Sequence, residues 1–266
     1  MDDRKIAIIG CGNLGLSIVK GIIQHKDIPN NIVTATRRSL PKIQHLSASD
    51  INVTDNNKKA VKDARIVILS VKPYNILAVC EEIKDALSKH AIIVSTATGI
   101  TISEMETVLG KDRTILRAMP NTAAGVGESL TCISDNGVEK EDYQIVEMLF
   151  SSIGTSIRIQ EDLMDAATVL GACGIAFVMR FMRAMVQGGI QIGFDARTAS
   201  EVVTQTVKGA STLIAAHGNH PEFEIDKVTT PKGCTIVGLN EMEHNGFSSS
   251  LIRGIVASHT KIEEDN

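Results

Sequence analysis

The stretch that decides the fold is IAIIGCGNLG, residues 6–15 of a 266-residue chain. Its first four residues are apolar on both faces, as in a buried parallel strand, and a helical pattern begins at Leu14. Gly10 permits a tight bend, Gly12 lets the backbone approach a pyrophosphate, and Gly15 allows close helix packing. The helix N-terminus adds N–H groups and a partial positive charge. The stretch therefore predicts a dinucleotide-binding loop, with a merely structural turn as the alternative.

Outward from this loop, short β-rich runs alternate with helical ones as far as residue 160. The predicted strands are Ile6–Ile9, Asn31–Thr36, Ile66–Val71, Ala91–Ser95, Thr114–Arg117, Ser129–Ile133 and Thr155–Ile159, and the first predicted helix is Leu14–Gln24. Strands that are apolar on both faces and separated by helices indicate a parallel sheet covered on each side. We therefore expect residues 1–160 to form an α/β domain with a doubly wound parallel sheet of the Rossmann type.

Residues 161–266 contain no convincing strand and predict an all-helical domain. The predicted helices are Asp162–Gln187, a helix capped by Asp195 that runs to Ala216, Cys234–Glu243 and Phe247–Glu263. The first would be roughly 39 Å long and is apolar on most faces, so we expect it to be buried against a second subunit. Its apolar run, Ala166–Met179, is 14 residues long, short of the roughly 20 that cross a bilayer, and we expect no membrane partner.

Composition excludes several classes of function. The net charge is −4 and the basic residues form no stripe, which argues against a nucleic-acid partner. The five cysteines are widely spaced and contain no C-x-x-C, which supports neither a disulfide framework nor a zinc site and favours the reducing cytoplasm. His217 and His220 flank a turn, but no third ligand follows at helical spacing, so we interpret them as surface residues and expect no metal.

The segment Thr36-Arg37-Arg38-Ser39 directly follows the second predicted strand. A domain that prefers NAD usually carries an acid there to bind the ribose hydroxyls. Two guanidinium groups can instead receive a 2′-phosphate, and charge-assisted bonds of about 1.5–3 kcal/mol would favour NADPH by roughly ten- to a hundredfold. We predict NADPH as the cofactor, with NADH as a weaker one; a solvated basic turn is the alternative.

Two more polar motifs follow strand ends, where open α/β sheets bind their ligands. One is Ser70-Val71-Lys72-Pro73, in which Lys72 is either a cofactor contact or a surface residue. The other is Arg117–Thr122, in which Asn121 and Thr122 either face the nicotinamide or the substrate, or belong to an ordinary turn.

The stretch VTTPKGCTI, residues 228–236, packs hydroxyls, a proline turn and backbone amides into the space before a new helix. Such an arrangement can hold a small carboxylate. Together with the glycine loop, it points to a reductase. For the Thr235 hydroxyl, an ordinary helix cap is the alternative.

With these motifs, the chain resembles the pyrroline-5-carboxylate reductases, the NAD(P)H-dependent last enzymes of proline synthesis. The matching segments are the Gly10 loop, Ser70–Pro73, Ser95–Ile100, Arg117–Thr122 and Val228–Ile236. The last is the most specific: the family loop reads Ser-Pro-Gly-Gly, a variable residue and Thr, and here it is Thr230-Pro231-Lys232-Gly233-Cys234-Thr235.

The resemblance implies hydride transfer to the cyclic imine of 1-pyrroline-5-carboxylate, giving L-proline. It implies that Thr235 contacts the imine nitrogen as the catalytic residue, while Thr230 and the loop amides, including those of Gly233 and Cys234, hold the carboxylate with Asn121 nearby. A protonated imine is already electrophilic, so positioning matters more than a strong base. The resemblance also implies a homodimer built on the helical domains, often assembled into larger rings.

The glycine loop, the basic segment and the resemblance together define the predicted cofactor contacts. These are Ile9, Gly10, Cys11, Gly12, Asn13, Leu14, Gly15, Thr36, Arg37, Arg38, Asn57, Ser70, Val71, Lys72, Pro73, Ala97 and Thr98.

The chain departs from the family pattern in three places. Residues 170–177 read LGACGIAF where the family has Ser-Gly-Ser-Gly-Pro-Ala-Tyr, Ala123 replaces a proline, and Lys232 replaces a glycine. Lys232 either changes the backbone conformation or brings an ammonium near the substrate acid. These departures keep two alternatives open, a divergent imine reductase and a non-catalytic NADPH-binding sensor. A β-hydroxyacid dehydrogenase is disfavoured, because it needs a lysine on the long helix and residues 162–194 contain none.

Overall fold

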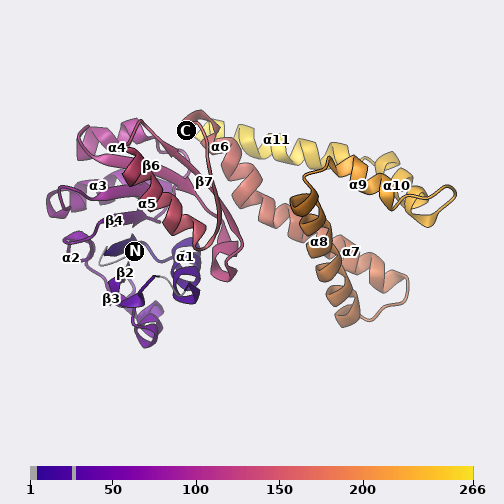
Figure 1. The fold of residues 1–266 in the computed structure, drawn as a ribbon, viewed down its shortest axis with the longest axis horizontal. Coiled ribbons are helices and arrows are strands. Elements are labelled where there is room, and N and C mark those ends of the chain that lie inside the picture. The colour runs from indigo at the N-terminus through magenta and orange to yellow at the C-terminus, as the bar shows by residue number, and fades with distance from the viewer. Residues whose placement is uncertain (1–4, 26–27, 266) are drawn as a thin grey trace. The chain divides into compact units, whose positions relative to one another are not determined.

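The computed structural model describes residues 5–25 and 28–265 and divides the chain into two compact units. One comprises Met1–Cys173 together with His259–Asn266, and the other comprises Gly174–Ser258. The first contains the sheet with its helices, and the second is built from helices (Figure 1).

An eight-stranded sheet forms the centre of the first unit. Its strands are β1 (Ile6–Ile9), β2 (Val33–Thr36), β3 (Asn52–Thr54), β4 (Ile66–Leu69), β5 (Ile92–Ser95), β6 (Thr114–Met119), β7 (Ser129–Asp135) and β8 (Gly154–Arg158). They lie in the order β3-β2-β1-β4-β5-β6-β7-β8. This is the Rossmann-type arrangement that the sequence predicts.

The last two strands correct the prediction of a wholly parallel sheet. Strand β7 pairs antiparallel with β6 and parallel with β8, so β7 and β8 run against the other six. The chain between β6 and β7 is shorter than the dozen or so residues that a parallel crossover needs, which is why it returns in the opposite direction. The edge strand β3 was not predicted at all.

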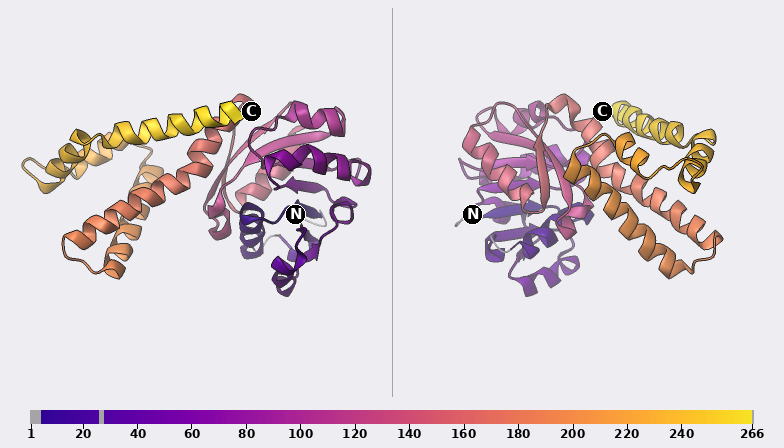
Figure 2. Two further views of the ribbon diagram at one scale, coloured as in Figure 1. Left: turned by 180° about the vertical axis from the view of Figure 1, so that it is seen from behind. Right: turned by 45° about the vertical axis from the view of Figure 1, so that its right-hand side comes forward.

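Helices cover both faces of the sheet, as Figures 1 and 2 show. On one face α1 (Asn13–Gln24) and α5 (Lys140–Ser151) bury their apolar residues in the same hydrophobic cluster as Ile6 and Ile8 of β1. On the other face the apolar residues of α2 (Asn57–Val61), α3 (Ile76–Ile83) and α4 (Ile102–Leu109) share a hydrophobic cluster with Ala7 and Ile9. Successive side chains of a strand point to opposite faces, so burial on both sides explains the unbroken apolar run.

Short 3-10 helices connect these elements. They are Asn30–Ile32, Leu40–Lys42, Gln44–Ser49, Pro73–Asn75, Lys84–Ala86, Thr122–Val126 and Glu161–Leu163. The last of them opens a continuous helical run where the sequence predicts one long helix. That run continues as α6 (Met164–Ala167), a π-helical segment (Thr168–Cys173) and α7 (Gly174–Gln191).

The second unit pairs α7 with α8 (Ala196–His217), which lie side by side in both views of Figure 2. The Asp195 side chain caps α8, as predicted, by accepting hydrogen bonds from the Arg197 and Thr198 amides at 3.0 and 3.1 Å. Helices α9 (Pro221–Lys227), α10 (Cys234–His244) and α11 (Phe247–Asp265) follow. The sequence pattern does not predict α9, which begins with Pro221 at its first helical position, a place where proline is favoured.

Helix α7 is exposed in the single chain, with none of residues 174–191 buried. By length and composition alone, Glu161–Gln191 could cross a membrane: its apolar window has a mean hydropathy of 1.7, and only 6% of that window is buried. The predicted burial of this helix is therefore not supplied by the chain itself. Large exposed apolar residues on other helices of the second unit include Val202, Leu213, Ile252 and Val256.

Candidate functional site

A cleft of about 1080 Å³ lies at the carboxyl ends of β1, β2 and β4. Of the predicted cofactor contacts, the cleft is lined by Ile9, Gly10, Cys11, Gly12, Asn13, Leu14, Thr36, Arg37, Arg38, Asn57, Ser70, Val71 and Lys72. Segments that are far apart in the sequence thus meet around one space, at the edge where open α/β sheets bind ligands.

The glycine loop has the backbone that its three glycines predict. Gly10 has a φ of +93°, and a Cβ there would lie 2.5 Å from Cγ1 of Val71. A Cβ on Gly15 would lie 2.6 Å from the Gly10 carbonyl oxygen, so the start of α1 packs directly on the loop. By contrast, apart from its chain neighbours, Gly12 has no atom within 4 Å of the position that a Cβ would take. Gly12 also precedes α1 without a side-chain cap, which leaves helix N–H groups for an anion such as a pyrophosphate.

Strand β2 holds this loop in place. The Cys11 amide donates to the Thr36 carbonyl oxygen at 2.8 Å, and the Arg37 guanidinium donates to the Cys11 carbonyl oxygen, also at 2.8 Å. The Cys11 side chain is buried, and burial raises the pKa of its thiol to about 12. Cys11 is thus a protonated packing residue at neutral pH and not a nucleophile.

Positive and negative side chains share the β2 side of the cleft. Arg37 is half-buried, whereas Arg38 and Lys42 are exposed. Strands β2 and β3 pair in register, so the acid Asp55 follows β3 next to this basic segment. The cations can receive a phosphate, and the polar lining as a whole fits a dinucleotide.

The cleft also contains residues that the sequence did not predict, and it omits some that it did. Ser39 and Thr122, which belong to the predicted polar segments, line the cleft as well. The additional lining residues are Lys42, Asp55, Tyr74, Asn75, Ala78, Val79, Glu82 and Thr96. Several of these lie on or just before α3, and no glycine or charge motif in the sequence predicts that α3 lines the cleft. The predicted contacts outside the lining are Gly15, Pro73, Ala97 and Thr98.

Asn121 joins β6 to the π-helical segment. Its Nδ2 donates to the Gly171 carbonyl oxygen at 3.0 Å, and its Oδ1 accepts from the Ala123 amide at 2.9 Å. The residue is buried and does not line the cleft. These bonds give Asn121 a structural role, and its predicted substrate contact stays a prediction.

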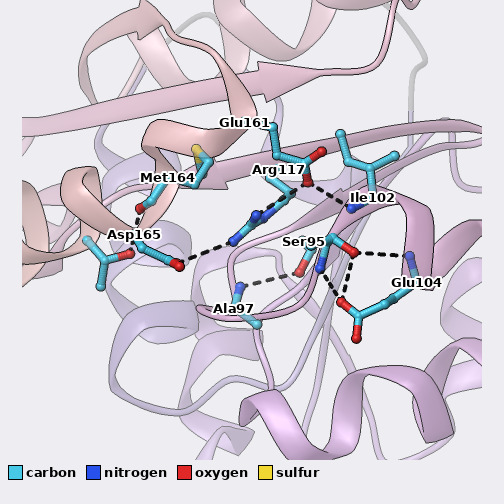
Figure 3. A network of polar contacts seen from close by, with 10 residues as sticks. Ser95, Ala97, Ile102, Glu104, Arg117, Glu161, Met164 and Asp165 are labelled. Carbon is cyan, nitrogen blue, oxygen red and sulfur yellow. Dashed lines mark hydrogen bonds and ion pairs between the residues drawn. The ribbon is translucent and has the colours of Figure 1, made fainter. Parts of the chain in front are cut away.

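A buried ion cluster connects β6 with the start of the helical run (Figure 3). The Arg117 guanidinium lies 3.3 Å from a Glu161 oxygen and 4.0 Å from an Asp165 oxygen. The same Glu161 oxygen accepts from the Ile102 amide, the first of α4, at 2.8 Å. Only 4% of the Arg117 side chain is exposed, so these carboxylates balance a charge that water cannot reach.

The predicted carboxylate loop lies in the second unit. The Gly233 amide donates to the Thr230 carbonyl oxygen at 2.9 Å, which closes a four-residue turn. Lys232, the third residue of that turn, has a φ of +61°, as a type II turn requires. Lysine therefore takes the left-handed backbone that glycine favours. A Cβ on Gly233 would lie 2.5 Å from the Thr230 hydroxyl oxygen, so any larger residue there would displace that hydroxyl.

Helix α10 starts directly after this turn. Gly233 precedes it and supplies no side-chain cap, so the N–H groups of the first turn of α10 are free to bind an anion. Thr235 is the second residue of the helix and half-buried, and Cys234 is exposed. The turn thus offers backbone N–H groups and hydroxyls close together, which suits a small carboxylate.

His217 and His220 have structural partners in the second unit. His217 lies 3.1 Å from a Glu224 oxygen, and the His220 ring accepts from the Glu222 amide at the start of α9. Hydrogen bonds, the strongest from Asn219, lower the pKa of Glu224 to about 2. Among the residues that the structure describes, no group of three or more His, Cys, Asp or Glu side chains could hold a metal ion.

Comparisons with models of known protein families match two parts of the chain. Residues 161–265 match the family model for pyrroline-5-carboxylate reductase dimerisation, and residues 5–99 match a model described as NADP oxidoreductase, coenzyme F420-dependent.

Individual relatives extend the similarity over nearly the whole chain. Pyrroline-5-carboxylate reductase 1 of Dictyostelium discoideum is 41% identical over 97% of this chain, which spans about half (49%) of that relative's length. Pyrroline-5-carboxylate reductase 2 of the same organism is 40% identical over 98% of this chain and 92% of its own. The crystal structure of Plasmodium falciparum pyrroline carboxylate reductase with NADP bound has a TM-score of 0.90 at 26% identity, covering 99% of this chain and 98% of that one.

Proposed function

This chain belongs to the pyrroline-5-carboxylate reductase family, and we propose that it reduces the C=N bond of 1-pyrroline-5-carboxylate to give L-proline, with NADPH as reductant. The observation that carries the proposal is the turn at Thr230–Gly233. In this turn the backbone of Lys232 has a left-handed conformation, and the turn leads into the N-terminus of α10, which has no side-chain cap. A turn of this kind, in a chain that also has the dinucleotide cleft, supplies the two binding functions that the reaction needs.

Different residues of the cleft bind different parts of the cofactor. The backbone around Gly12 and the N-terminus of α1 receive the pyrophosphate, while Arg37 and Arg38 receive the 2′-phosphate. Ser70–Lys72 follow β4 on the path toward the nicotinamide. When bound, NADPH supplies the hydride that reduces the imine carbon.

The turn residues hold and orient the substrate. The Cys234 amide and the Thr230 hydroxyl bind the carboxylate, and the positive end of α10 favours its charge. The Gly233 amide, which was also expected to bind the carboxylate, instead closes the turn on the Thr230 carbonyl oxygen. The Thr235 hydroxyl then bonds to the imine nitrogen, as acceptor when that nitrogen carries a proton and as donor when it does not. Thr235 is the one catalytic residue we assign, because a protonated imine needs positioning more than a strong base.

The apolar helices of the second unit complete the assembly. A dimerisation domain over residues 161–265 makes the protein a homo-oligomer, and we assign the exposed apolar face of α7 to a homodimer interface that larger rings can build on. We place the enzyme in the cytoplasm, since all five cysteines are free.

Steady-state oxidation of NADPH with pyrroline-5-carboxylate tests the proposal. Thr235→Val keeps the shape of the side chain and removes the hydroxyl, so kcat should fall at least tenfold, whereas Thr235→Ser should retain most of the rate. Thr107→Ala, on the exposed face of α4, serves as a control and should match the wild type.

The other outcomes separate the alternatives. Binding of NADPH without proline formation would identify a sensor. Turnover of other cyclic imines in preference to pyrroline-5-carboxylate would identify a divergent imine reductase. Equal rates for Thr235→Val and the wild type would remove Thr235 from the mechanism.

A further inference from the structure

A chain of hydrogen bonds crosses the β2 side of the cofactor cleft and ends at Glu82 on α3. The Gly10 amide donates to Oγ1 of Thr36 at 3.3 Å, and that hydroxyl donates to Oδ1 of Asn57 at 2.8 Å. Nδ2 of Asn57 then donates to Oε2 of Glu82 at 3.0 Å. This series of hydrogen bonds joins the glycine loop, β2, α2 and α3, and its four residues, Gly10, Thr36, Asn57 and Glu82, all line the cleft.

Glu82 is the residue that fixes the donor-to-acceptor direction of this hydrogen-bond series. A threonine hydroxyl can donate or accept, so Thr36 alone would tolerate either orientation of the Asn57 amide. An ionised carboxylate only accepts, so Glu82 requires the NH2 side of Asn57. The amide oxygen of Asn57 must therefore face Thr36, and one N–H of its NH2 group remains for a ligand in the cleft.

This orientation matters for one of the two nicotinamide dinucleotides in particular. The 2′-phosphate of NADP offers only acceptor oxygens, so it gains from an N–H and is repelled by an amide oxygen. The 2′-hydroxyl of NAD can donate or accept and tolerates both orientations of Asn57.

We infer that Glu82 is a positioning residue for coenzyme selectivity: it holds the Asn57 amide with its N–H toward the 2′-phosphate and so favours NADP over NAD. Glu82 acts through Asn57 and does not touch the reacting atoms. The inference rests on the proposed function, because it takes the cleft as the NADPH site.

The charge of Glu82, taken alone, predicts the opposite effect. A carboxylate beside a phosphate repels it, so removal of the charge should strengthen NADP binding if Glu82 acts only through its field. Two substitutions separate these effects. Glu82→Gln removes the charge and keeps an acceptor oxygen for Asn57, whereas Glu82→Ala removes both.

The experiment is calorimetric titration of the full chain with NADP+ and NAD+, alongside KM and kcat for the reduced forms. For Glu82→Ala we expect the Kd for NADP+ to rise about tenfold, as for loss of one hydrogen bond to a charged group. The Kd for NAD+ should stay within about twofold and kcat should be unchanged. Glu82→Gln should rescue NADP+ binding to near the wild-type value. Glu81→Ala, which removes an exposed neighbouring carboxylate, is the matched control.

Two results would overturn the inference. One is tighter NADP+ binding by both Glu82 variants, which would assign the effect to charge. The other is an equal loss of NADP+ and NAD+ binding in Glu82→Ala, which would indicate a general structural role. Binding does not require turnover, so a wild type that binds NADP+ selectively but forms no proline would refute the proposed function and leave this inference intact.

Discussion

The guanidinium of Arg37 donates a hydrogen bond of 2.8 Å to the Cys11 carbonyl oxygen, which ties the basic segment to the glycine loop. Its neighbour Arg38 is exposed and makes no hydrogen bond or ion pair within residues 5–25 and 28–265. Arg37 therefore holds the loop, and we propose that Arg38 serves only the 2′-phosphate.

Replacement of the two arginines should separate these tasks. Arg38→Gln is expected to raise KM for NADPH about tenfold and leave KM for NADH unchanged, because it removes only a phosphate contact. Arg37→Gln should weaken both dinucleotides, because the loop loses a restraint. Initial rates with each dinucleotide measure this. A loss by Arg38→Gln that is equal for NADPH and NADH would contradict the assignment.

The glycine loop predicts opposite outcomes for two alanine substitutions. Gly12→Ala meets no atom within 4 Å apart from its chain neighbours, so the protein should keep its melting temperature while the new methyl group blocks the pyrophosphate and weakens NADPH binding by tenfold or more. Gly10→Ala combines a φ of +93° with a Cβ 2.5 Å from Val71, so the fold itself should be destabilised. Thermal unfolding with and without NADPH distinguishes them: a Gly12→Ala variant that binds NADPH normally would argue against a pyrophosphate at this position.

Lys232 occupies a left-handed backbone conformation at a φ of +61°. Lys232→Gly should stabilise the protein by about 0.5 kcal/mol, because relief of about 1–2 kcal/mol of backbone strain exceeds the added flexibility of the unfolded chain. Lys232→Ala keeps the strain and is the control for stability.

Both Lys232 variants also remove the ammonium. If it attracts the substrate carboxylate, KM for pyrroline-5-carboxylate should rise two- to fivefold in each, the size expected of an exposed charge pair at roughly 1 kcal/mol or less. Urea unfolding and substrate kinetics measure the two effects separately. An unchanged KM in both variants would show that the ammonium plays no part in binding.

Burial raises the pKa of the Cys11 thiol to about 12, from an ordinary value of 9.0. The folded state thus keeps a proton that the unfolded state loses above pH 9. Its contribution to stability is complete below pH 9 and is lost as the pH rises toward 12. At pH 10.5, the wild type should have lost about 2 kcal/mol more than Cys11→Ala, relative to each protein at pH 8.

Urea unfolding under reducing conditions at the two pH values gives this difference directly. Cys80, whose pKa is also raised by burial to about 11, stays in both proteins and cancels in the comparison. The same pH dependence in both proteins would show that the Cys11 thiol is not protected in the folded state.

The sequence predicts best where local pattern and burial agree. The loop at Gly10, the strands that are apolar on both faces and the Asp195 cap of α8 all have local causes, and the structure confirms each of them. The strand Asn52–Thr54 was missed because it is short, lies at the sheet edge and has no apolar run. The reversal of β7 and β8 depends on the length of a connection, which the hydrophobic pattern does not express.

The candidate site shows a similar limit. Residues that follow strand ends could be predicted, because topology places strand ends together at one edge. Glu82 and Tyr74 could not, since their place in the cleft depends on how α3 packs beside β4 and α2. The π-helical turn at Thr168–Cys173 has no sequence signal either: its Gly171 carbonyl bonds to Asn121, a residue far away in the chain.

The carboxylate of Glu161 bonds both to Arg117, 44 positions away in the sequence, and to the Ile102 amide, 59 positions away. A change at position 161 thus affects two places at once: the balance of the Arg117 charge on β6 and the start of α4 at Ile102. Only a replacement that keeps both a negative charge and the reach of glutamate preserves both contacts.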